Sequence, residues 1–444
     1  MSLNQLLEQL NSLNISGISS QLDKCEENEV VFYNLKNNEK ALIAFEERLK
    51  QSKAKIIVVN NTFNGSDSRV ITFKNEEFQT FLFSLLDHYY PVPEKKYIGI
   101  TGTNGKTSCV HHLAQLLHQN NKNVLTIGTL GILLNFKQAE DFGLTTPGLC
   151  ELRKTLFKHQ HNYDYCLMEV SSHSLDQDRI HGITFEAVGW TNLTQDHLDY
   201  HQTMEKYFDA KLKIRNYLKN NGKLFISEKN VFNKIKNREN IEMAQNFDLS
   251  KVSKNLQTSF ALKNINLCLS ILTSLGLKID SLDKLTAPSG RFESVELDGK
   301  VAIVDYAHTP DALENVCLGV RKSYKNSKLI TVFGCGGDRD SSKRPIMGQI
   351  AQQHSDHIVV TSDNPRSEEP QNIINDILKG VDVSKSVSIE ADRKKAIHLA
   401  LSLANSGDIV LIAGKGHETY QEVKGVKTPF DDLKMIKNFW GLSS

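Results

Sequence analysis

Residues 102–108, with the sequence GTNGKTS, combine the residue types that bind nucleotide phosphates. They lie between an apolar run at 97–101 and a helical pattern at 106–119, so that glycine N–H groups and a helix N-terminus face one point. In such a loop Lys106 reaches the β- and γ-phosphates, and the Thr107 hydroxyl binds Mg²⁺. Ile100 replaces the first glycine of the full Walker pattern, and the shortened form also occurs in unrelated turns. The strand–loop–helix context favours a nucleotide site.

A second group of reactive side chains lies in the middle of the chain. Glu169 ends an apolar run at 164–169, where a carboxylate is placed either to bind Mg²⁺ or simply to end a soluble strand. Residues 191–201 (TNLTQDHLDYH) hold two histidines and two aspartates within six positions. This pattern indicates cation or phosphate chemistry, or else a polar helix start capped by Asp196. The spacing matches neither H-E-x-x-H nor a zinc finger.

Polar turns follow four apolar runs in the last third of the chain. A glycine-rich turn that carries an arginine can bind an anionic group. Because the carboxyl ends of parallel strands share the edge at which α/β proteins bind ligands, the four turns together predict a binding edge. Each turn taken alone is as compatible with an ordinary connection rich in Gly and Asp. The turns are 305–311 (DYAHTPD), 334–340 (GCGGDRD), 363–366 (DNPR) and 414–418 (GKGHE).

Alternating apolar runs and helical patterns must position these residues. Strands are expected at 55–60, 97–101, 123–127, 164–169, 187–191, 223–227, 301–305, 329–333, 357–361, 387–389 and 409–413. Helices are expected at 1–13, 40–50, 76–88, 106–119, 204–218, 264–275, 312–322, 373–378 and 393–403. Proline and glycine at 91–93 and 287–290 mark domain boundaries. The fold class is therefore α/β with three domains, a small N-terminal domain at 1–92, a central P-loop ATPase-like parallel-sheet domain at 93–288 and a C-terminal Rossmann-like domain at 289–444.

Composition excludes several classes of protein. The 444 residues carry 53 Lys and Arg against 52 Asp and Glu, so no broad basic surface for nucleic acid is expected. No apolar run approaches the roughly 18 residues of a membrane span, and we expect no membrane insertion. Seven scattered cysteines without a C-x-x-C pair favour a reducing compartment over disulfides or a cysteine zinc site. We expect a cytoplasmic, bacterial monomer that binds small molecules.

A series of motifs between residues 98 and 422 resembles the Mur ligase family, in the family's own order. They are GITGTNGKTS, GLTTP, MEVSSHSLDQDRI, TNLTQDHLDYH, DAK, GRFE, VDYAHTPDAL, FGCGGDRD, KRPIMG, TSDNPRSEEP and AGKGHE. The DNPR segment is similar to the MurE branch that uses meso-2,6-diaminopimelate. The resemblance implies an ADP-forming ligase that joins meso-diaminopimelate to the D-Glu of UDP-MurNAc-L-Ala-D-Glu through an acyl phosphate, in the synthesis of peptidoglycan precursors.

The same resemblance implies roles for residues around ATP and metal. It assigns ATP binding to Gly102, Thr103, Asn104, Gly105, Lys106, Thr107, Ser108, Asn264, Arg291, Asp305 and His308. Two Mg²⁺ ions would be held by Thr107, Glu169, His197 and Lys211, the last as a carbamate. Lys106, Lys211, His197 and Glu169 are the expected catalytic residues. Composition alone makes Lys211 a solvated helix lysine, and only the DAK match gives it a role.

The remaining positions implied by the family concern the other two substrates. The UDP-MurNAc-dipeptide site would comprise Ser20, Thr145, Thr146, Ser171, Gln177 and Arg179. The meso-diaminopimelate site would comprise Arg339, Asp363, Asn364, Arg366, Gly414 and Glu418. Arg366 can bind the distant carboxylate of diaminopimelate bidentately while Glu418 meets its ammonium. L-Lysine lacks that carboxylate and would leave Arg366 unpaired.

The chain departs from the family pattern at three places. The N-terminal segment lacks an Asp-Ser-Arg motif, with Ser19-Ser20-Gln21 as its nearest match, and Ala261 follows Phe260 where the family often has asparagine. Gln195 replaces a common arginine. Three alternatives stay open at this point: a ligase that uses L-lysine, a folylpolyglutamate-synthase-like ligase, and a nucleotide-binding regulatory module without turnover.

Overall fold

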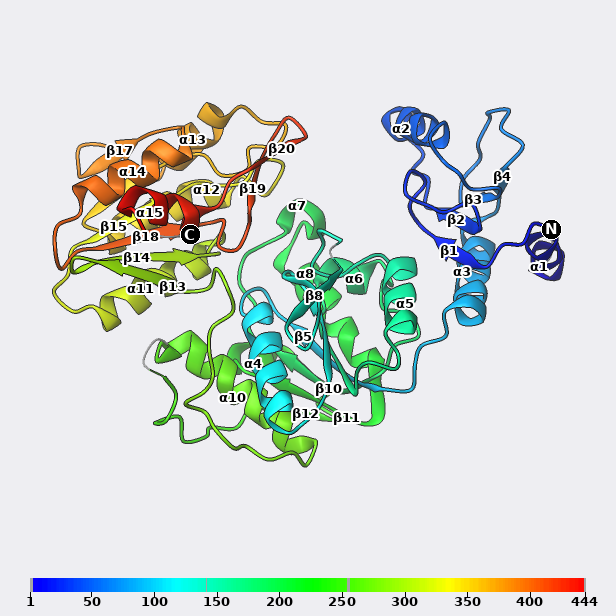
Figure 1. The fold of residues 1–444 in the computed structure, drawn as a ribbon, viewed down its shortest axis with the longest axis horizontal. Coiled ribbons are helices and arrows are strands. Elements are labelled where there is room, and N and C mark those ends of the chain that lie inside the picture. Colours follow the sequence, from blue (N-terminus) through cyan, green and yellow to red (C-terminus); the bar gives the residue numbers. More distant parts are fainter. Residues whose placement is uncertain (1–2, 141, 254–255, 443–444) are drawn as a thin grey trace. The chain divides into compact units, whose positions relative to one another are not determined.

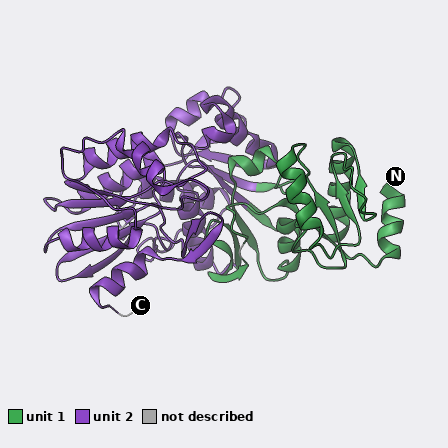
Figure 2. Cartoon of the chain, turned by 90° about the horizontal axis from the view of Figure 1, so that it is seen from above, with its two compact units in different colours: residues 1–97, 123–185 green, residues 98–122, 186–444 purple. Residues whose placement is uncertain are grey.

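The computed structural model describes residues 3–140, 142–253 and 256–442. By its internal contacts the chain divides into two compact units, residues 1–97 with 123–185 and residues 98–122 with 186–444 (Figure 2). Helices and strands alternate in both units, which confirms the predicted α/β class. The boundaries proposed near residues 92 and 288 stay predictions.

The first unit begins with a four-stranded parallel sheet in the order β1-β2-β3-β4. Alternate side chains of a strand enter opposite cores. On one face Val30 and Phe32 pack with helices α1 and α3, and on the other Val31 packs with Phe45 of α2. The predicted strand at 55–60 and the three helices are confirmed. These elements are α1 (Leu3–Ser12), β1 (Gly17–Ser19), β2 (Glu29–Tyr33), α2 (Glu39–Leu49), β3 (Ile57–Val59), β4 (Val70–Thr72) and α3 (Asn75–Tyr89).

The rest of the first unit contributes strands in the order β9-β6-β7-β8. Strands β6 and β9 are parallel, whereas β7 is antiparallel to both β6 and β8. The two predicted strands are confirmed as β6 and β9, and the β7–β8 hairpin was not predicted. The elements are β6 (Val124–Gly128), β7 (Gly131–Leu134), β8 (Lys137–Glu140), α5 (Leu149–Lys158), β9 (Tyr165–Glu169) and α6 (Ser172–Asp176).

The second unit opens with strands in the order β12-β11-β10-β5, in which β5 and β10 are parallel and so are β11 and β12. The predicted helix at 204–218 is too long, because the chain tightens into a 3₁₀ turn at Lys213–Tyr217 and then enters β11. The elements are β5 (Lys96–Thr101), α4 (Lys106–Gln119), β10 (Phe185–Trp190), α7 (Leu198–His201), α8 (Met204–Leu212), β11 (Leu218–Ile226), α9 (Lys229–Lys234), β12 (Ile241–Met243) and α10 (Ser259–Ser274).

A six-stranded sheet in the order β13-β14-β18-β15-β16-β17 forms the last part of the second unit, yellow-green to red in Figure 1. All its strands are parallel except β13. Helices α11, α12 and α13 pack on one face, and α14 and α15 pack on the other. The elements are β13 (Glu293–Leu297), β14 (Lys300–Asp305), α11 (Pro310–Ser323), β15 (Leu329–Phe333), α12 (Lys343–His354), β16 (His357–Val360), α13 (Pro370–Leu378), β17 (Val387–Ile389), α14 (Arg393–Leu403), β18 (Ile409–Ala413), β19 (Tyr420–Val423), β20 (Val426–Pro429) and α15 (Asp432–Trp440).

The parallel pairing confirms that the four polar turns share one edge of this sheet. Strands β14, β15, β16 and β18 run side by side in one direction, and a polar turn follows the carboxyl end of each. In the part of the chain that the structure describes, no helix combines the length and the apolar run that a bilayer crossing needs. All seven cysteines are buried and free.

A buried ion pair joins α14 to α15 in the same part of the second unit. Arg393 donates to both carboxylate oxygens of Asp432 at 2.8 and 2.7 Å, and neither side chain is exposed. Since Arg393→Met leaves a buried charge without its partner, we expect it to lower the free energy of unfolding by about 3–5 kcal/mol in urea denaturation. Lys385→Ala removes an exposed pair with Asp382 and should change stability by less than ~1 kcal/mol. Equal effects of the two variants would contradict this account.

Candidate active site

The phosphate loop is held in shape by the segment that follows β10. Asn192 Oδ1 accepts hydrogen bonds from the backbone N–H groups of Thr103 and Asn104 at 3.1 and 2.8 Å. Thr191 Oγ1 donates to the carbonyl of Asn104 at 2.6 Å. Gly102 has a φ of 137°, and a Cβ there would lie 1.9 Å from Thr191 Oγ1, so only glycine fits. Residues 191–192 therefore scaffold the loop, a role that sequence reasoning missed.

Two lysine ammonium groups converge on one carbonyl oxygen of this loop. Lys106 Nζ donates to the carbonyls of Gly102 and Thr103 at 2.9 and 2.7 Å, and Lys211 Nζ donates to Gly102 at 2.8 Å. Lys211 is 1 % exposed and lies 4.6 Å above the ring centre of Tyr207. Burial, and next to it the charge of Lys106, hold the pKa of Lys211 well below its ordinary value. Lys211 is thus a buried amine whose surroundings disfavour its charged form, instead of a solvated lysine.

The turn after β14 contacts the phosphate loop directly. Asn104 Nδ2 donates to Asp311 Oδ2 at 2.9 Å, and Thr309 Oγ1 donates to Asn104 Oδ1 at 3.3 Å. Arg291 donates to Thr107 Oγ1 at 3.4 Å and covers the Tyr306 ring. The second unit therefore brings loop residues together with predicted ATP contacts from the C-terminal sheet.

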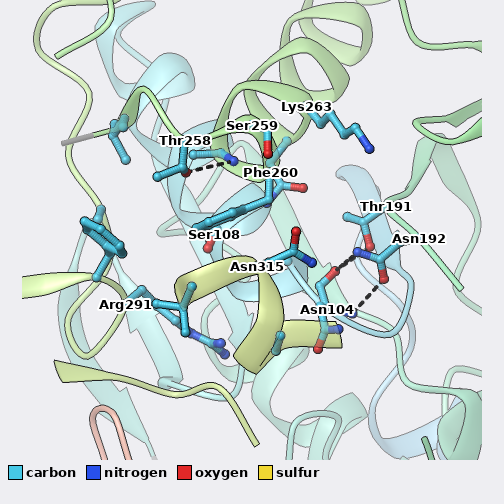
Figure 3. A pocket seen from close by; sticks show the side chains of 18 of the residues that line it. Asn104, Ser108, Thr191, Asn192, Thr258, Ser259, Phe260, Lys263, Arg291 and Asn315 are labelled. Carbon is cyan, nitrogen blue, oxygen red and sulfur yellow. Dashed lines mark hydrogen bonds between the residues drawn. The ribbon is translucent and has the colours of Figure 1, made fainter. Parts of the chain in front are cut away.

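A pocket lies between α4, α10 and α11 in the second unit (Figure 3). Residues of the phosphate loop, of α10 and α11 and of the segment before β13 line it. Phe260, Phe292 and Pro288 supply apolar walls. Figure 3 shows Arg291 on one side and Asn104 with Thr191 and Asn192 on another. This mixture of apolar walls and convergent polar groups suits a base and its phosphates.

Several predicted ATP residues line the pocket, namely Asn104, Gly105, Ser108, Asn264, Arg291 and Asp305. Gly102, Thr103, Lys106, Thr107 and His308 do not line it, although the first four belong to the adjoining loop. The prediction missed His112, whose buried Nδ1 has no hydrogen-bond partner among the described residues. Burial lowers the pKa of His112 to about 3, so its ring is neutral. Periodicity made this histidine look like one more core residue of α4.

Asp196 and His197 belong to a charged cluster in the second unit. Asp196 lies 3.4 Å from His197 Nε2 and 3.7 Å from Lys343 Nζ. Burial acts to raise the pKa of Asp196, but the nearby cations outweigh it and the pKa is lowered. His308 Nδ1 forms a hydrogen bond with the carbonyl of Tyr306. Burial lowers the pKa of His308 to about 4. The cluster thus combines an ionised carboxylate with a neutral imidazole.

The first unit holds Glu169 and most of the residues predicted for the UDP-linked substrate. Glu169 is buried and accepts hydrogen bonds from Thr129 N and Oγ1 at 2.8 and 3.1 Å. Thr146 Oγ1 donates to the carbonyl of Glu169 at 2.9 Å, and Arg179 donates to the carbonyl of Thr146 at 3.0 Å. Further contacts join Thr145 to Thr129, Ser171 to Thr146 and Gln177 to Arg179. These predicted residues therefore form one hydrogen-bonded group.

Ser20 lies outside this group. Its hydroxyl donates to the carboxylate of Glu151, with Oε1 at 2.8 Å and Oε2 at 2.9 Å, and its backbone N–H donates to Oε1 at 3.2 Å. A carboxylate at this place repels a diphosphate. The role of Ser20 in binding the UDP-linked substrate stays a prediction.

The turns after β16 and β18 bring the residues predicted for the amino acid together. Asn364 Nδ2 donates to Glu418 Oε2 at 2.8 Å, and Arg366 donates to the carbonyl of Gly337 at 2.6 Å. Gly414 has a φ of 119°, and a Cβ there would lie 2.5 Å from Asp363 Oδ2. Arg339 is exposed and donates to the carbonyl of Asp338 at 3.3 Å. All six predicted residues thus follow strands at one edge of the sheet, with Arg339 exposed to solvent.

The donors present suit a hard cation. The described residues contain no group of three or more His, Cys, Asp or Glu side chains able to hold a metal by themselves. Mg²⁺ is commonly bound by one or two protein oxygens together with substrate phosphates and water. The buried Thr107 hydroxyl and the Glu169 carboxylate, each described within its own unit, are donors of that kind.

Two family models match the chain. The Mur ligase middle domain matches residues 100–279, and the Mur ligase glutamate ligase domain matches residues 290–416. Together these ranges cover more than half of the chain and contain the phosphate loop, the first three polar turns and the start of the fourth.

Individual proteins and structures resemble the chain over most of its length. The UDP-N-acetylmuramoyl-L-alanyl-D-glutamate–2,6-diaminopimelate ligase of Aquifex aeolicus (strain VF5) is 38% identical over 424 residues, 89% of this chain and 85% of the relative. A solved structure of a ligase of the same name has a TM-score of 0.59 at 28% identity and covers 96% of this chain and 94% of that one. Mycobacterium tuberculosis folylpolyglutamate synthase, complexed with ADP and AMPPCP, has a TM-score of 0.61 at 16% identity over 74% of this chain and 91% of that one, a similarity of fold alone.

Proposed function

The chain belongs to the Mur ligase family, and on that premise we propose that it joins meso-2,6-diaminopimelate to the D-Glu carboxylate of UDP-MurNAc-L-Ala-D-Glu, with conversion of ATP to ADP and phosphate. The observation that carries this proposal is the similarity over 89% of the chain to a ligase of that printed name. The folylpolyglutamate alternative has only a likeness of fold behind it, and no relative described above supports L-lysine. The substrates are water-soluble, and we place the enzyme in the cytoplasm as a monomer.

The reaction needs an activated carboxylate. A D-Glu carboxylate oxygen attacks the γ-phosphorus of ATP, and the bond from that phosphorus to ADP breaks, which gives an acyl phosphate. The amine of diaminopimelate then attacks the acyl carbon, one proton leaves the nitrogen, and phosphate departs as the amide forms. Holding three ligands in register removes much of the entropic barrier. The phosphate loop and the sheet edge supply that positioning.

Residues of the phosphate loop bind and orient the nucleotide in this scheme. Lys106 Nζ, which caps the carbonyls of Gly102 and Thr103 in the structure, reaches the transferred phosphoryl group when ATP is present. Arg291, beside Thr107, adds a second positive charge. In the second unit Thr107 and His197 would hold Mg²⁺, which neutralises phosphate charge when bound.

Lys211 is the best candidate for carbamylation. A neutral amine nitrogen attacks CO₂, an N–C bond forms and a proton leaves, so the lysine becomes a carboxylate-like anion. Its burial and lowered pKa favour this neutral form. The carbamate keeps one N–H, which can still donate to the carbonyl of Gly102 while its oxygens face the cation. The buried lysine would then carry a negative charge useful beside Mg²⁺.

The test of this function is substrate-dependent ADP release by the purified protein. We expect ADP only when ATP, Mg²⁺, UDP-MurNAc-L-Ala-D-Glu and meso-diaminopimelate are all present, with one tripeptide product per ADP by mass spectrometry. A pteroylglutamate with glutamate should give none. ADP release that does not depend on the UDP-linked dipeptide would contradict the proposal.

A further inference from the structure

Lys415 is a fully buried cation in the turn after β18 that no predicted role includes. Its side chain is 0 % exposed. Nζ donates to Asn364 Oδ1 at 2.9 Å and to Glu418 Oε2 at 3.1 Å, and it lies 3.5 Å from Asp363 Oδ1. Lys415 thus contacts three residues of the proposed amino-acid site at once.

The surrounding charges do not balance. Asp363 and Glu418 bring two carboxylates, while Lys415 brings one ammonium within ion-pair distance. The nearby Arg393 guanidinium is already matched by Asp432 on α15. In this largely buried place the two carboxylates outnumber the ammonium by one, and either an incoming cation or a proton on Glu418 balances the charge.

Asn364 links Lys415 and Glu418 to strand β19 by hydrogen bonds. Its Oδ1 accepts from both Lys415 Nζ and the backbone N–H of Glu422 at 2.9 Å, and its Nδ2 donates to Glu418. The geometry of Glu418 thus depends on the amide of Asn364, which Lys415 orients. Loss of the ammonium would change both the charge and the direction of the Glu418 carboxylate.

We propose that Lys415 is a positioning residue for the amino-acid substrate: it holds Asp363 and Glu418 as an ionised pair in which one unmatched negative charge receives an ammonium group of the incoming diamino acid. This inference rests on the proposed function. It adds a residue that itself makes no bond to substrate but sets the charge that substrate meets.

Protonation of Glu418 gives the proposal a distinctive signature. Burial raises the pKa of Glu418, Asp363 raises it further, and Lys415 opposes both. Besides these, Arg393 from α14 and Tyr306 from the turn after β14 act on the same carboxylate. Without Lys415, Glu418 takes up a proton more readily, and a neutral acid binds an ammonium weakly. The defect should therefore be largest at low pH and shrink as pH rises.

Lys415→Met tests this through the KM of meso-diaminopimelate in ADP release. We expect that KM to rise at least tenfold at pH 7, to recover at least threefold between pH 7 and 8.5, and to leave the KM of ATP within twofold. Lys415→Arg keeps the charge and should stay within threefold of wild type. Lys427→Met is the matched control, because Lys427 is exposed yet contacts the same Tyr420 ring as Lys415.

Thermal unfolding with and without ADP checks folding. If Lys415→Met does not fold, Lys415→Gln, which can still bond to Asn364, takes its place with the same expected KM shift. An unchanged KM for meso-diaminopimelate, or equal rises for ATP and the amino acid, would overturn the role of Lys415. A wild-type protein inactive with meso-diaminopimelate would instead contradict the proposed function.

Discussion

Lys211→Ala is expected to lower kcat by roughly 10²–10³-fold, the loss typical of removing one preorganised electrostatic group. The side chain is buried against the phosphate loop, with its nitrogen on the carbonyl of Gly102. Alanine removes the buried nitrogen proposed to take up CO₂ and carry a carboxylate-like charge. The measurement is ADP release at saturating substrates, with thermal protection by ADP as the check that the variant folds and binds nucleotide.

Two controls separate the carbamate from simple loss of packing. Lys206→Ala, an exposed position on the same helix α8, should keep wild-type kcat. A short carboxylic acid such as acetate should restore part of the activity of Lys211→Ala, because it supplies the missing carboxylate. Turnover of Lys211→Ala near the wild-type rate would remove the carbamate from the mechanism. If acetate fails to restore any activity of Lys211→Ala, that result would also remove the carbamate from the mechanism.

Arg366→Ala is expected to abolish selection of the amino acid. A site built to hydrogen-bond a polar group rejects analogues lacking it by up to ~10⁴-fold. We therefore expect kcat/KM for meso-diaminopimelate to fall ~10²–10⁴-fold, while that for L-lysine, already low, changes by less than about threefold. The comparison requires kinetics with both amino acids on both proteins.

The contacts of Arg366 allow its effect on selection of the amino acid to be separated from that of nearby surface charges. Its φ is 51°, and its side chain donates to the carbonyl of Gly337. Its backbone bonds to Glu422 of β19 and to Lys424, the residue after that strand. Lys424→Ala is the control, since this side chain is 67% exposed and pairs with Glu369 on the surface. If Arg366→Ala lowers activity with both amino acids by the same factor, Arg366 has a structural role rather than a selective one.

Sequence patterns located the elements that carry the chemistry with good accuracy. Helix α4, strands β17 and β18, and helix α14 have the predicted bounds. The apolar residues of α4 and β18 are buried, and Gly105, Asp392 and Gly414 mark ends of α4, α14 and β18, so periodicity and turn chemistry agree there. The shared edge of the four polar turns followed from parallel pairing, which strand–helix alternation predicts.

The missed features depend on contacts between distant segments. Strands β1 and β4 were not predicted; each has three residues and forms part of a sheet only by pairing with β2 or β3. The pocket walls at Phe260 and Phe292 look like ordinary core positions until the chain folds. Lys415 in GKGHE and Lys211 in DAK look like solvated lysines, because burial of a charge depends on partners such as Asn364 that lie far away in sequence.

Kinetics of the wild-type protein with meso-diaminopimelate and with L-lysine test the central claim most directly. Both amino acids are supplied with ATP, Mg²⁺ and UDP-MurNAc-L-Ala-D-Glu, and ADP release gives kcat/KM for each. The account predicts at least a 100-fold preference for meso-diaminopimelate, because only this amino acid has the second carboxylate for Arg366. Equal turnover with L-lysine, or a preference for it, would contradict the account.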